Sequence, residues 1–279
     1  MINFLLNLRC LFYTIFDRFI FDNRPTSMNK PGWKLTFYDD FSSGLDKNKW
    51  RTDTYWGGRY STDSIKNDNK APISYMKDDA FKIIQNKFSI ENRKETTIIH
   101  HIDSGIDYGT FSIPYVTGGI DSSISFQQKY GYFEIRSKTP NTPGTWPAFW
   151  LASTEAWPPE IDIYENYTGT FKGDNSFNSN VHYGIANTKT KGDYCTTHWV
   201  PKPSDDFHVY ATEWDVDYIK FYFDGVLIKV IKDKKILKWF NHKMHIIIGN
   251  GIDINTVDKC LFPNYLTIDY VKAYKKIIS

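Results

Sequence analysis

The chain has 279 residues, of which 41% are hydrophobic, 24% charged and 17% aromatic. This content of apolar side chains excludes an intrinsically disordered chain. The balance of 34 Lys and Arg against 32 Asp and Glu excludes binding to nucleic acid through net charge alone. Nine Trp, nineteen Tyr and twenty Phe are more rings than a core usually requires. We therefore expect a sheet-rich interior, an exposed stacking surface, or both.

The first 22 residues differ from the rest of the chain. Their apolar side chains recur at helical spacing and form one stripe, made of Phe4, Leu5, Leu8, Leu11, Phe12, Ile15, Phe16 and Phe19. Three charged residues interrupt this run, so it is a poor membrane span, and no small-residue cleavage site follows it. A degenerate export signal, a helix at a membrane surface and a helix packed on its own domain all stay open. Pro25 marks a boundary between an amphipathic segment, residues 1–26, and a domain of residues 27–279.

From residue 30 onward, short runs rich in β-branched and aromatic residues alternate with turn residues. The predicted strands include residues 34–38, 80–85, 131–138, 218–223, 226–231, 245–248 and 266–274. Asp224-Gly225 between two of these runs predicts a two-residue hairpin turn. No long amphipathic helix and no internal repeat interrupts the series. This pattern predicts an all-β sandwich of two large antiparallel sheets in one domain.

The chain has three cysteines, Cys10, Cys195 and Cys260. Three residues at these distances in the sequence form neither a disulfide framework nor a zinc motif. Base rates favour isolated thiols, and a pairing of Cys195 with Cys260 stays open.

The most informative stretch is Glu160-Ile-Asp-Ile-Tyr-Glu165. On a strand, Glu160 and Asp162 share one face while the two isoleucines point into a core. Strict alternation would bury Glu165 among apolar side chains, at a cost of several kcal/mol for an unpaired charge. One extra residue, a β-bulge near Ile163-Tyr164, would bring Glu165 to the face of the other two acids.

Three acids on one face repel one another, so at least one is expected to hold a proton near neutral pH. Double-displacement hydrolysis of a glycoside requires one ionised and one protonated carboxyl group about 5 Å apart. A solvated acidic strand or a calcium site would show the same pattern. Three tryptophans in the same region, Trp146, Trp150 and Trp157, favour a sugar-binding function, because sugar rings stack on aromatic faces.

These segments resemble glycoside hydrolase family 16, a family of jelly-roll enzymes that cut β-glucans and β-galactans internally. The similar segments occur in the family's order: Tyr115-Val-Thr-Gly-Gly-Ile-Asp-Ser122, Tyr130-Gly-Tyr-Phe-Glu-Ile-Arg136, Gly144-Thr-Trp-Pro-Ala-Phe-Trp-Leu151, Glu160 to Glu165, Val181-His-Tyr-Gly184, Phe207-His-Val-Tyr210, Glu213-Trp214, Phe223-Asp-Gly225 and Ile268-Asp-Tyr-Val271. The resemblance covers residues 33 to 275. It implies a concanavalin-like jelly roll of two curved antiparallel sheets, and the acids match the bulged form of laminarinase-like and galactanase-like members.

The resemblance implies a role for each acid. Glu160 would be the nucleophile, Glu165 the general acid and base, and Asp162 the assistant between them. The candidate substrate-binding residues are Trp146, Trp157, His182, Trp56, Arg59 and Trp150. For His182, a structural sheet histidine is an equal alternative. For Trp56 and Arg59 the alternative is a surface loop, and Trp150 could instead belong to the core.

The resemblance requires no cofactor, although the family often carries a structural calcium, for which Asp269 would be the side-chain ligand. It implies a secreted or cell-surface enzyme, expected as a monomer, that hydrolyses a β-1,3- or β-1,3-1,4-glucan. Trp157-Pro-Pro precedes Glu160 where many laminarinase-like members have glycine, so the linkage stays open. A galactan hydrolase, a transglycosylase and a non-catalytic carbohydrate-binding sandwich are the alternatives.

Overall fold

Two sheets pack face to face in the computed structural model, which describes residues 30–54, 58–61, 63–167 and 175–277. The larger sheet has the order β15 (Val226–Ile231), β14 (Tyr218–Phe223), β13 (His208–Asp215), β7 (Gly131–Lys138), β17 (Asn264–Lys276), β4 (Lys87–Asp103), β5 (Ile106–Thr117) and β2 (Ser74–Met76). In addition, β1 (Trp33–Asp39) pairs with β17, and β3 (Phe81–Ile84) pairs with β4. The strand β2 runs parallel to β5, and the other pairs are antiparallel.

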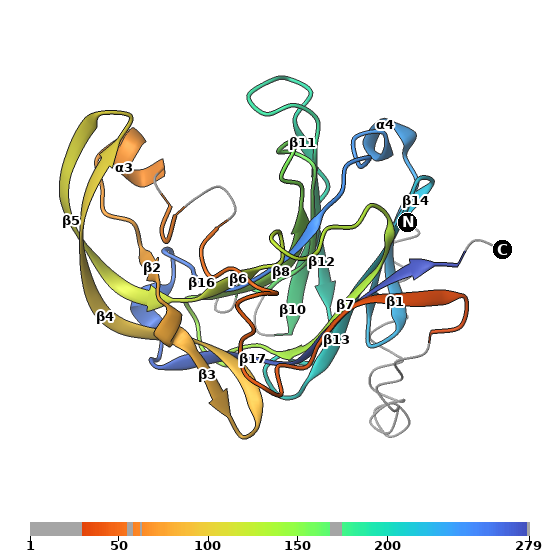
Figure 1. The fold of residues 1–279 in the computed structure, drawn as a ribbon, viewed down its shortest axis with the longest axis horizontal. Helices are drawn as coiled ribbons and strands as arrows, with labels where there is room; N and C mark the ends of the chain where they lie inside the picture. Colours follow the sequence, from red (N-terminus) through yellow and green to blue (C-terminus); the bar gives the residue numbers. More distant parts are fainter. Residues whose placement is uncertain (1–29, 55–57, 62, 168–174, 278–279) are drawn as a thin grey trace.

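The smaller sheet carries the three acids. Its order is β11 (Gly192–Asp193), β10 (Ser176–Tyr183), β9 (Glu160–Glu165), β8 (Thr145–Ala152), β16 (His245–Ile252) and β6 (Gly119–Asp121), and β12 (Thr196–Trp199) also pairs with β10. Figure 1 shows the β4–β5 hairpin projecting on one side of this sheet and the loop between β10 and β11 on the other. The helical elements in the described part of the chain are short: α3 (Asp63–Asp68), α4 (Lys234–Leu237), η1 (Asp78–Ala80) and η2 (Val257–Lys259).

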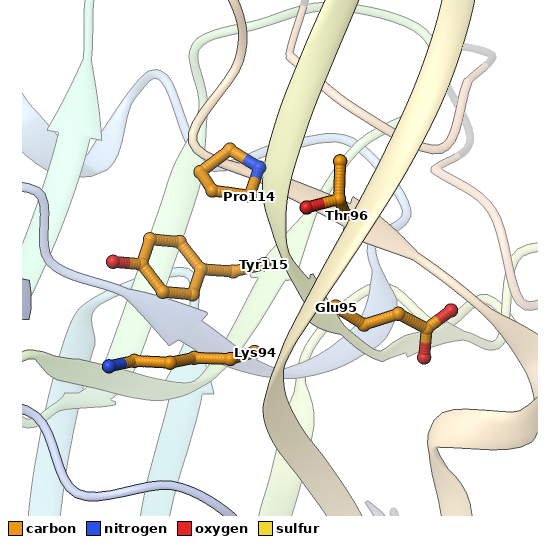
Figure 2. Close-up of a pocket in the computed structure, with 5 residues that line it drawn as sticks. All are labelled: Lys94, Glu95, Thr96, Pro114 and Tyr115. Atoms are coloured by element: carbon orange, nitrogen blue, oxygen red, sulfur yellow. The ribbon is translucent and has the colours of Figure 1, made fainter.

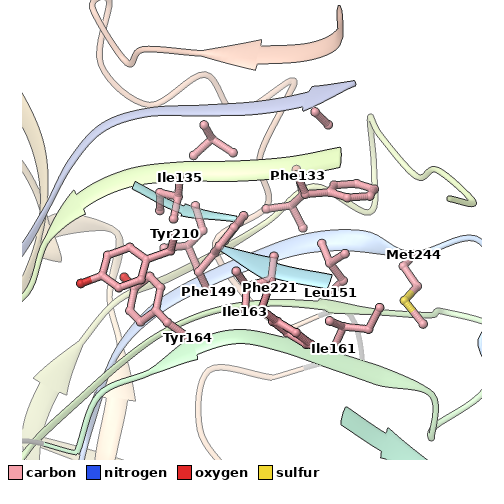
Figure 3. Packing of buried hydrophobic residues seen from close by; sticks show 14 of the residues in the cluster. Phe133, Ile135, Phe149, Leu151, Ile161, Ile163, Tyr164, Tyr210, Phe221 and Met244 are labelled. Carbon is pink, nitrogen blue, oxygen red and sulfur yellow. The ribbon is translucent and has the colours of Figure 1, made fainter. Parts of the chain in front are cut away.

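The core lies between the inner faces of the two sheets. Alternation along each strand sends one set of side chains inward, as with Phe133 and Ile135 on β7 and Phe149 and Leu151 on β8. Figure 3 shows these side chains meeting those of β9 and β13. Burial of this large apolar surface is the main favourable contribution to folding of the sandwich.

The predicted all-β sandwich and its strands are confirmed. The run 131–138 is β7, and 218–223 and 226–231 are β14 and β15. Asp224 and Gly225 have φ values of 47° and 78°, which fit the predicted two-residue turn. The long β4–β5 hairpin was not among the strands predicted from the hydrophobic pattern. Its exposed positions mix polar residues with isoleucines, among them Ile98, Ile102 and Ile106.

Several expectations concern the termini and the cysteines. Residues 1–26 lie outside the described residues, so the prediction of an amphipathic helix there stays a prediction. No helix within the described ranges has the length and apolar character needed to cross a membrane. Cys195 is exposed and Cys260 buried, and neither belongs to a disulfide, so the two do not pair.

A pocket lies at the base of the β4–β5 hairpin. It has a volume of about 410 Å³ and is lined by Lys94, Glu95, Thr96, Pro114 and Tyr115 (Figure 2). None of the predicted site residues lines it, so it is separate from the acids on β9.

Candidate active site

The predicted β-bulge is present on β9. Opposite β8, Asp162 pairs with Trp150 and Tyr164 pairs with Phe149, which leaves Ile163 as the extra residue. The same irregularity occurs opposite β10. Because of this extra residue, Glu165 points to the same outer face as Glu160 and Asp162, while Tyr164 turns into the core. Three carboxyl groups therefore line the outer face of the smaller sheet.

Glu160 is held by a tryptophan from the segment before β9. The indole Nε1 of Trp157 donates to Oε2 of Glu160 at 2.5 Å. The Trp157 ring is 44% exposed, and Nζ of Lys191 lies 4.7 Å from its centre. The predicted stacking residue is therefore also a hydrogen-bond donor to the predicted nucleophile, and such bonds to a charged acceptor are the stronger kind.

Glu165 has a similar arrangement on the other side. The indole Nε1 of Trp146 donates to Oε1 of Glu165 at 3.0 Å, and the Tyr167 hydroxyl donates to the same oxygen at 3.2 Å. The Trp146 and Tyr167 rings stack with their centres 5.0 Å apart. Trp146 is 39% exposed, so its ring still offers surface to a sugar.

His182, on the neighbouring strand β10, completes the cluster. Its Nε2 lies 3.2 Å from Oδ2 of Asp162 and 3.9 Å from Oε1 of Glu160. The backbone N–H of Val181 donates to Oδ1 of Asn180, which turns the Asn180 Nδ2 group toward His182 Nε2 at 3.2 Å. Nε2 therefore accepts, and Nδ1 carries the proton and donates to Asp193 at 2.5 Å. This pattern fits a neutral His182 with its ring fixed between two strands.

The acids share a partly dehydrated environment. Burial, followed by the charge of Asp162, raises the pKa of Glu160 to about 8. Burial, with the charge of Glu165, raises the pKa of Asp162 well above its ordinary value. Burial also raises the pKa of Glu165, against the donors Trp146 and Tyr167. The cluster therefore cannot be fully ionised near neutral pH and holds at least one proton.

The same cluster contains atoms that could bind a cation. One oxygen each of Glu160 and Asp162 and one ring nitrogen of His182 lie within 4.8 Å of one another. However, Trp157 donates to Oε2 of Glu160 and Asn180 donates to Nε2 of His182, so two of these three groups already accept from neighbouring donors. The arrangement fits proton transfer better than metal binding.

The remaining predicted substrate-binding residues divide into three cases. Trp150 lies on the outer face, opposite Asp162 on β9 and Ile247 on β16. Arg59 contacts Asp78 at 2.8 Å and the carbonyl of Met76 at 3.2 Å, and none of the three acids is among its contacts in the described part of the chain. Trp56 lies outside the described residues. The structure thus brings Trp146, Trp150, Trp157 and His182 to the acids, and does not bring Arg59.

The surroundings of Asp269 do not fit the expected calcium ion. One of its oxygens pairs with Lys87, and the other accepts from Nη1 of Arg136 at 2.7 Å. Burial alone would raise the pKa of Asp269, but these two cations outweigh burial and lower it. Two cationic side chains on one carboxylate repel a divalent cation, so we derive no role for calcium at this position.

Three site residues were missed by the sequence reasoning. Tyr167 was not among the predicted site residues, although alternation from Glu165 places it on the same face. No local sequence pattern indicates Asp193 or Asn180. Asp193 reaches His182 through the pairing of β10 with β11, and Asn180 reaches it through the orientation of its side-chain amide.

The fold and the site together define a class of protein. A β-sandwich with three acids on one sheet face, flanked by exposed tryptophans, is the arrangement of a protein that acts on carbohydrate chains. The family model described as "Glycosyl hydrolases family 16" matches residues 75–259. The chain belongs to this family and is a glycoside hydrolase.

Individual proteins agree with this assignment. The chain is 29% identical to "Beta-glucanase" of Rhodothermus marinus over 88% of this chain and 86% of that protein. It is 29% identical to "Endo-1,3-1,4-beta-glycanase ExsH" of Rhizobium meliloti over 68% of this chain, but spans only 40% of that relative's length. The laminarinase catalytic domain of Thermotoga maritima has a TM-score of 0.67 at 26% identity, over 88% of this chain and 99% of that one. The concanavalin-like jelly roll is thereby confirmed.

Proposed function

We propose that the protein is a retaining endo-β-glycanase that hydrolyses internal linkages of a β-1,3- or β-1,3-1,4-glucan. The observation that carries this proposal is the bulge at Ile163, which places Glu160 and Glu165 on one face with Asp162 between them. A non-catalytic sugar-binding protein would need the tryptophans but would gain nothing from three carboxyl groups that raise one another's pKa.

In the first step, ionised Glu160 attacks the anomeric carbon from the face opposite the leaving group. Protonated Glu165 gives its proton to the glycosidic oxygen, so the bond to the leaving sugar breaks while the Glu160 ester forms. In the second step, Glu165 removes a proton from water, the water oxygen attacks the anomeric carbon, and the ester bond to Glu160 breaks. Two inversions restore the original anomeric configuration.

Asp162, which faces His182, stabilises the negative charge of Glu160 for these steps. The side chain of Asp162 is 4% exposed against 18% for Glu160, so Asp162 loses more hydration and is the better holder of the shared proton. A protonated Asp162 donates to Glu160 and spreads the negative charge of the nucleophile. When the ester forms, that charge disappears and the proton stays on Asp162, whose Oδ2 lies 3.2 Å from Nε2 of His182.

The substrate class is supported by the names of two similar proteins, a β-glucanase and an endo-1,3-1,4-β-glycanase. Exposed indoles of Trp146 and Trp157 suit the apolar faces of β-linked sugar rings. A polymer of this kind cannot cross a membrane, so we place the action of the enzyme outside the cell or at its surface.

A panel digest tests the proposal. Laminarin, lichenan, agarose, carrageenan and xyloglucan are incubated with the wild-type protein and with Glu160→Gln, and reducing ends and product lengths are measured. We expect wild-type cutting of laminarin or lichenan into oligosaccharides of mixed length, and a loss of about 10³-fold or more in Glu160→Gln. Release of single sugars only, or undiminished activity of Glu160→Gln, would contradict the proposal.

A further inference from the structure

A buried lysine lies on the core side of the smaller sheet, behind the acids, and has no part in the steps above. Lys229 belongs to β15 of the larger sheet, yet its side chain reaches the smaller one and is 0% exposed. Lysine is almost never fully buried without partners, because its charge loses hydration. The contacts of this ammonium group are therefore informative.

Two backbone carbonyls accept from Nζ of Lys229. One is that of Ser179 on β10, at 3.1 Å, and the other is that of Tyr194, between β11 and β12, at 2.6 Å. The rings of Tyr194 and Phe221 lie with their centres 4.9 Å from Nζ, which suits a cation between aromatic faces. The lysine thus joins the two sheets at a point where apolar contacts alone would be expected.

The two carbonyls belong to the segments that carry the His182 contacts. The Ser179 carbonyl is in the peptide bond to Asn180, which lies opposite Asp162 and donates to His182. Tyr194 directly follows Asp193, which accepts from the other nitrogen of His182. Both ends of the His182 hydrogen-bond pattern therefore depend on backbone that Lys229 holds.

We propose that Lys229 is a positioning residue for the acid cluster. It fixes β10 and the β11–β12 connection so that His182 faces Asp162, and it places a positive charge behind Asp162 that favours the ionised form of the paired acids. This inference rests on the proposed function, because it assigns Lys229 a role in the same reaction.

Three groups interact with the charge of the lysine, and a fourth acts on one of these three. Asp162 on β9 and Cys195 before β12 interact with its charge, His198 on β12 is repelled by it, and Asp193 on β11 acts on Asp162. Burial lowers the pKa of Lys229 to about 7. Its positive charge is therefore strongest below neutral pH, where it favours loss of the first proton from the paired acids.

The test compares Lys229→Met with Lys220→Met. Lys220 lies on the adjacent strand β14, where its side chain approaches Glu213 and lies apart from the acids, so its loss is the matched control. The pH dependence of kcat/KM is measured on the glucan that the wild-type enzyme cuts, with near-ultraviolet circular dichroism to confirm folding. We expect the acidic limb of the Lys229→Met profile to move up by about one pH unit, because the charge that favours ionisation is gone. We also expect kcat to fall about tenfold while KM changes little.

Lys229→Gln removes the charge and keeps an N–H donor on a side chain one atom shorter, so it serves where Lys229→Met fails to fold. Its acidic limb is expected to move in the same direction. An acidic limb that coincides with those of wild type and Lys220→Met would overturn the inference, even if Lys229→Met were less stable. Wild-type protein that cuts no glucan would contradict the proposed function instead, so the two failures are distinguishable.

Discussion

Trp157 donates its indole N–H to Glu160 at 2.5 Å, so the residue next to the nucleophile both holds it and presents a ring to solvent. Trp146 does the same for Glu165 at 3.0 Å. Each working acid thus has its own tryptophan, one from the segment before β9 and one from β8. The two indoles therefore have two functions: their exposed rings offer stacking surface, and their N–H groups favour the ionised form of the acids.

Trp157→Phe should keep the ring and remove the hydrogen bond. The indole donor lowers the pKa of Glu160 against burial, so its loss should raise that pKa further. We expect the acidic limb of kcat/KM to move up by about one pH unit, with a roughly tenfold loss of rate below that limb. The measurement is a pH–rate profile between pH 4 and pH 9, in buffers of constant ionic strength.

Trp33→Phe is the control for this substitution. Trp33 packs on Tyr132 on the larger sheet and donates to none of the acids in the described structure. Its profile should match that of wild type. If Trp157→Phe also leaves the acidic limb in place and lowers only the affinity for substrate, the indole acts by stacking alone.

A small anion should restore activity after removal of either carboxyl group, and the configuration of the product should differ between the two variants. In Glu160→Ala, azide can take the place of the nucleophile, and a single inversion yields the α-glycosyl azide. In Glu165→Ala, the Glu160 ester still forms with a good leaving group, and azide then yields the β-glycosyl azide. The substrate is a β-glycoside with an activated aryl leaving group, and the anomer is assigned by NMR. Azides of the same configuration from both variants would contradict the assigned roles.

Asp269 should support the fold through its ion pairs without calcium. Lys87 and Arg136 lower its pKa, so this stabilisation is present above the ordinary carboxyl pKa and is lost as pH falls through the lowered one. Asp269→Asn should therefore lose about 1–3 kcal/mol of unfolding free energy at pH 7, and the difference from wild type should vanish toward pH 2. Denaturant titrations at both pH values measure it.

The same experiment carries a calcium control. EDTA and added calcium should both leave the wild-type unfolding midpoint unchanged if the cations at Asp269 are Lys87 and Arg136. A midpoint that falls in EDTA and recovers with calcium in wild type, but not in Asp269→Asn, would show that the ion displaces these side chains.

Local pattern predicted much of this structure. Strict alternation along β9 would have buried Glu165 without a partner, so a bulge was expected, and it lies at Ile163. The turn at Asp224-Gly225 was predicted because these two residue types favour a two-residue hairpin turn. The partners of His182 and the position of Lys229 could not be predicted in this way. They depend on which strands pair and how the two sheets are superposed, and no local periodicity encodes either.

The same limit explains the calcium expectation. The family resemblance implied that Asp269 is a calcium ligand, but the neighbours of its carboxylate come from β4 and β7, far away in the chain. Only the register of β17 against these strands brings Lys87 and Arg136 to it.

The most direct test of the account is the configuration of the product at the moment of cleavage. Proton NMR follows the anomeric signals while the wild-type enzyme cuts its glucan, before the new reducing end mutarotates. Double displacement through Glu160 and Glu165 predicts that the β-anomer appears first and the α-anomer grows in later. An α-anomer that appears first would mean a single displacement by water, and would contradict the assignment of Glu160 as the nucleophile.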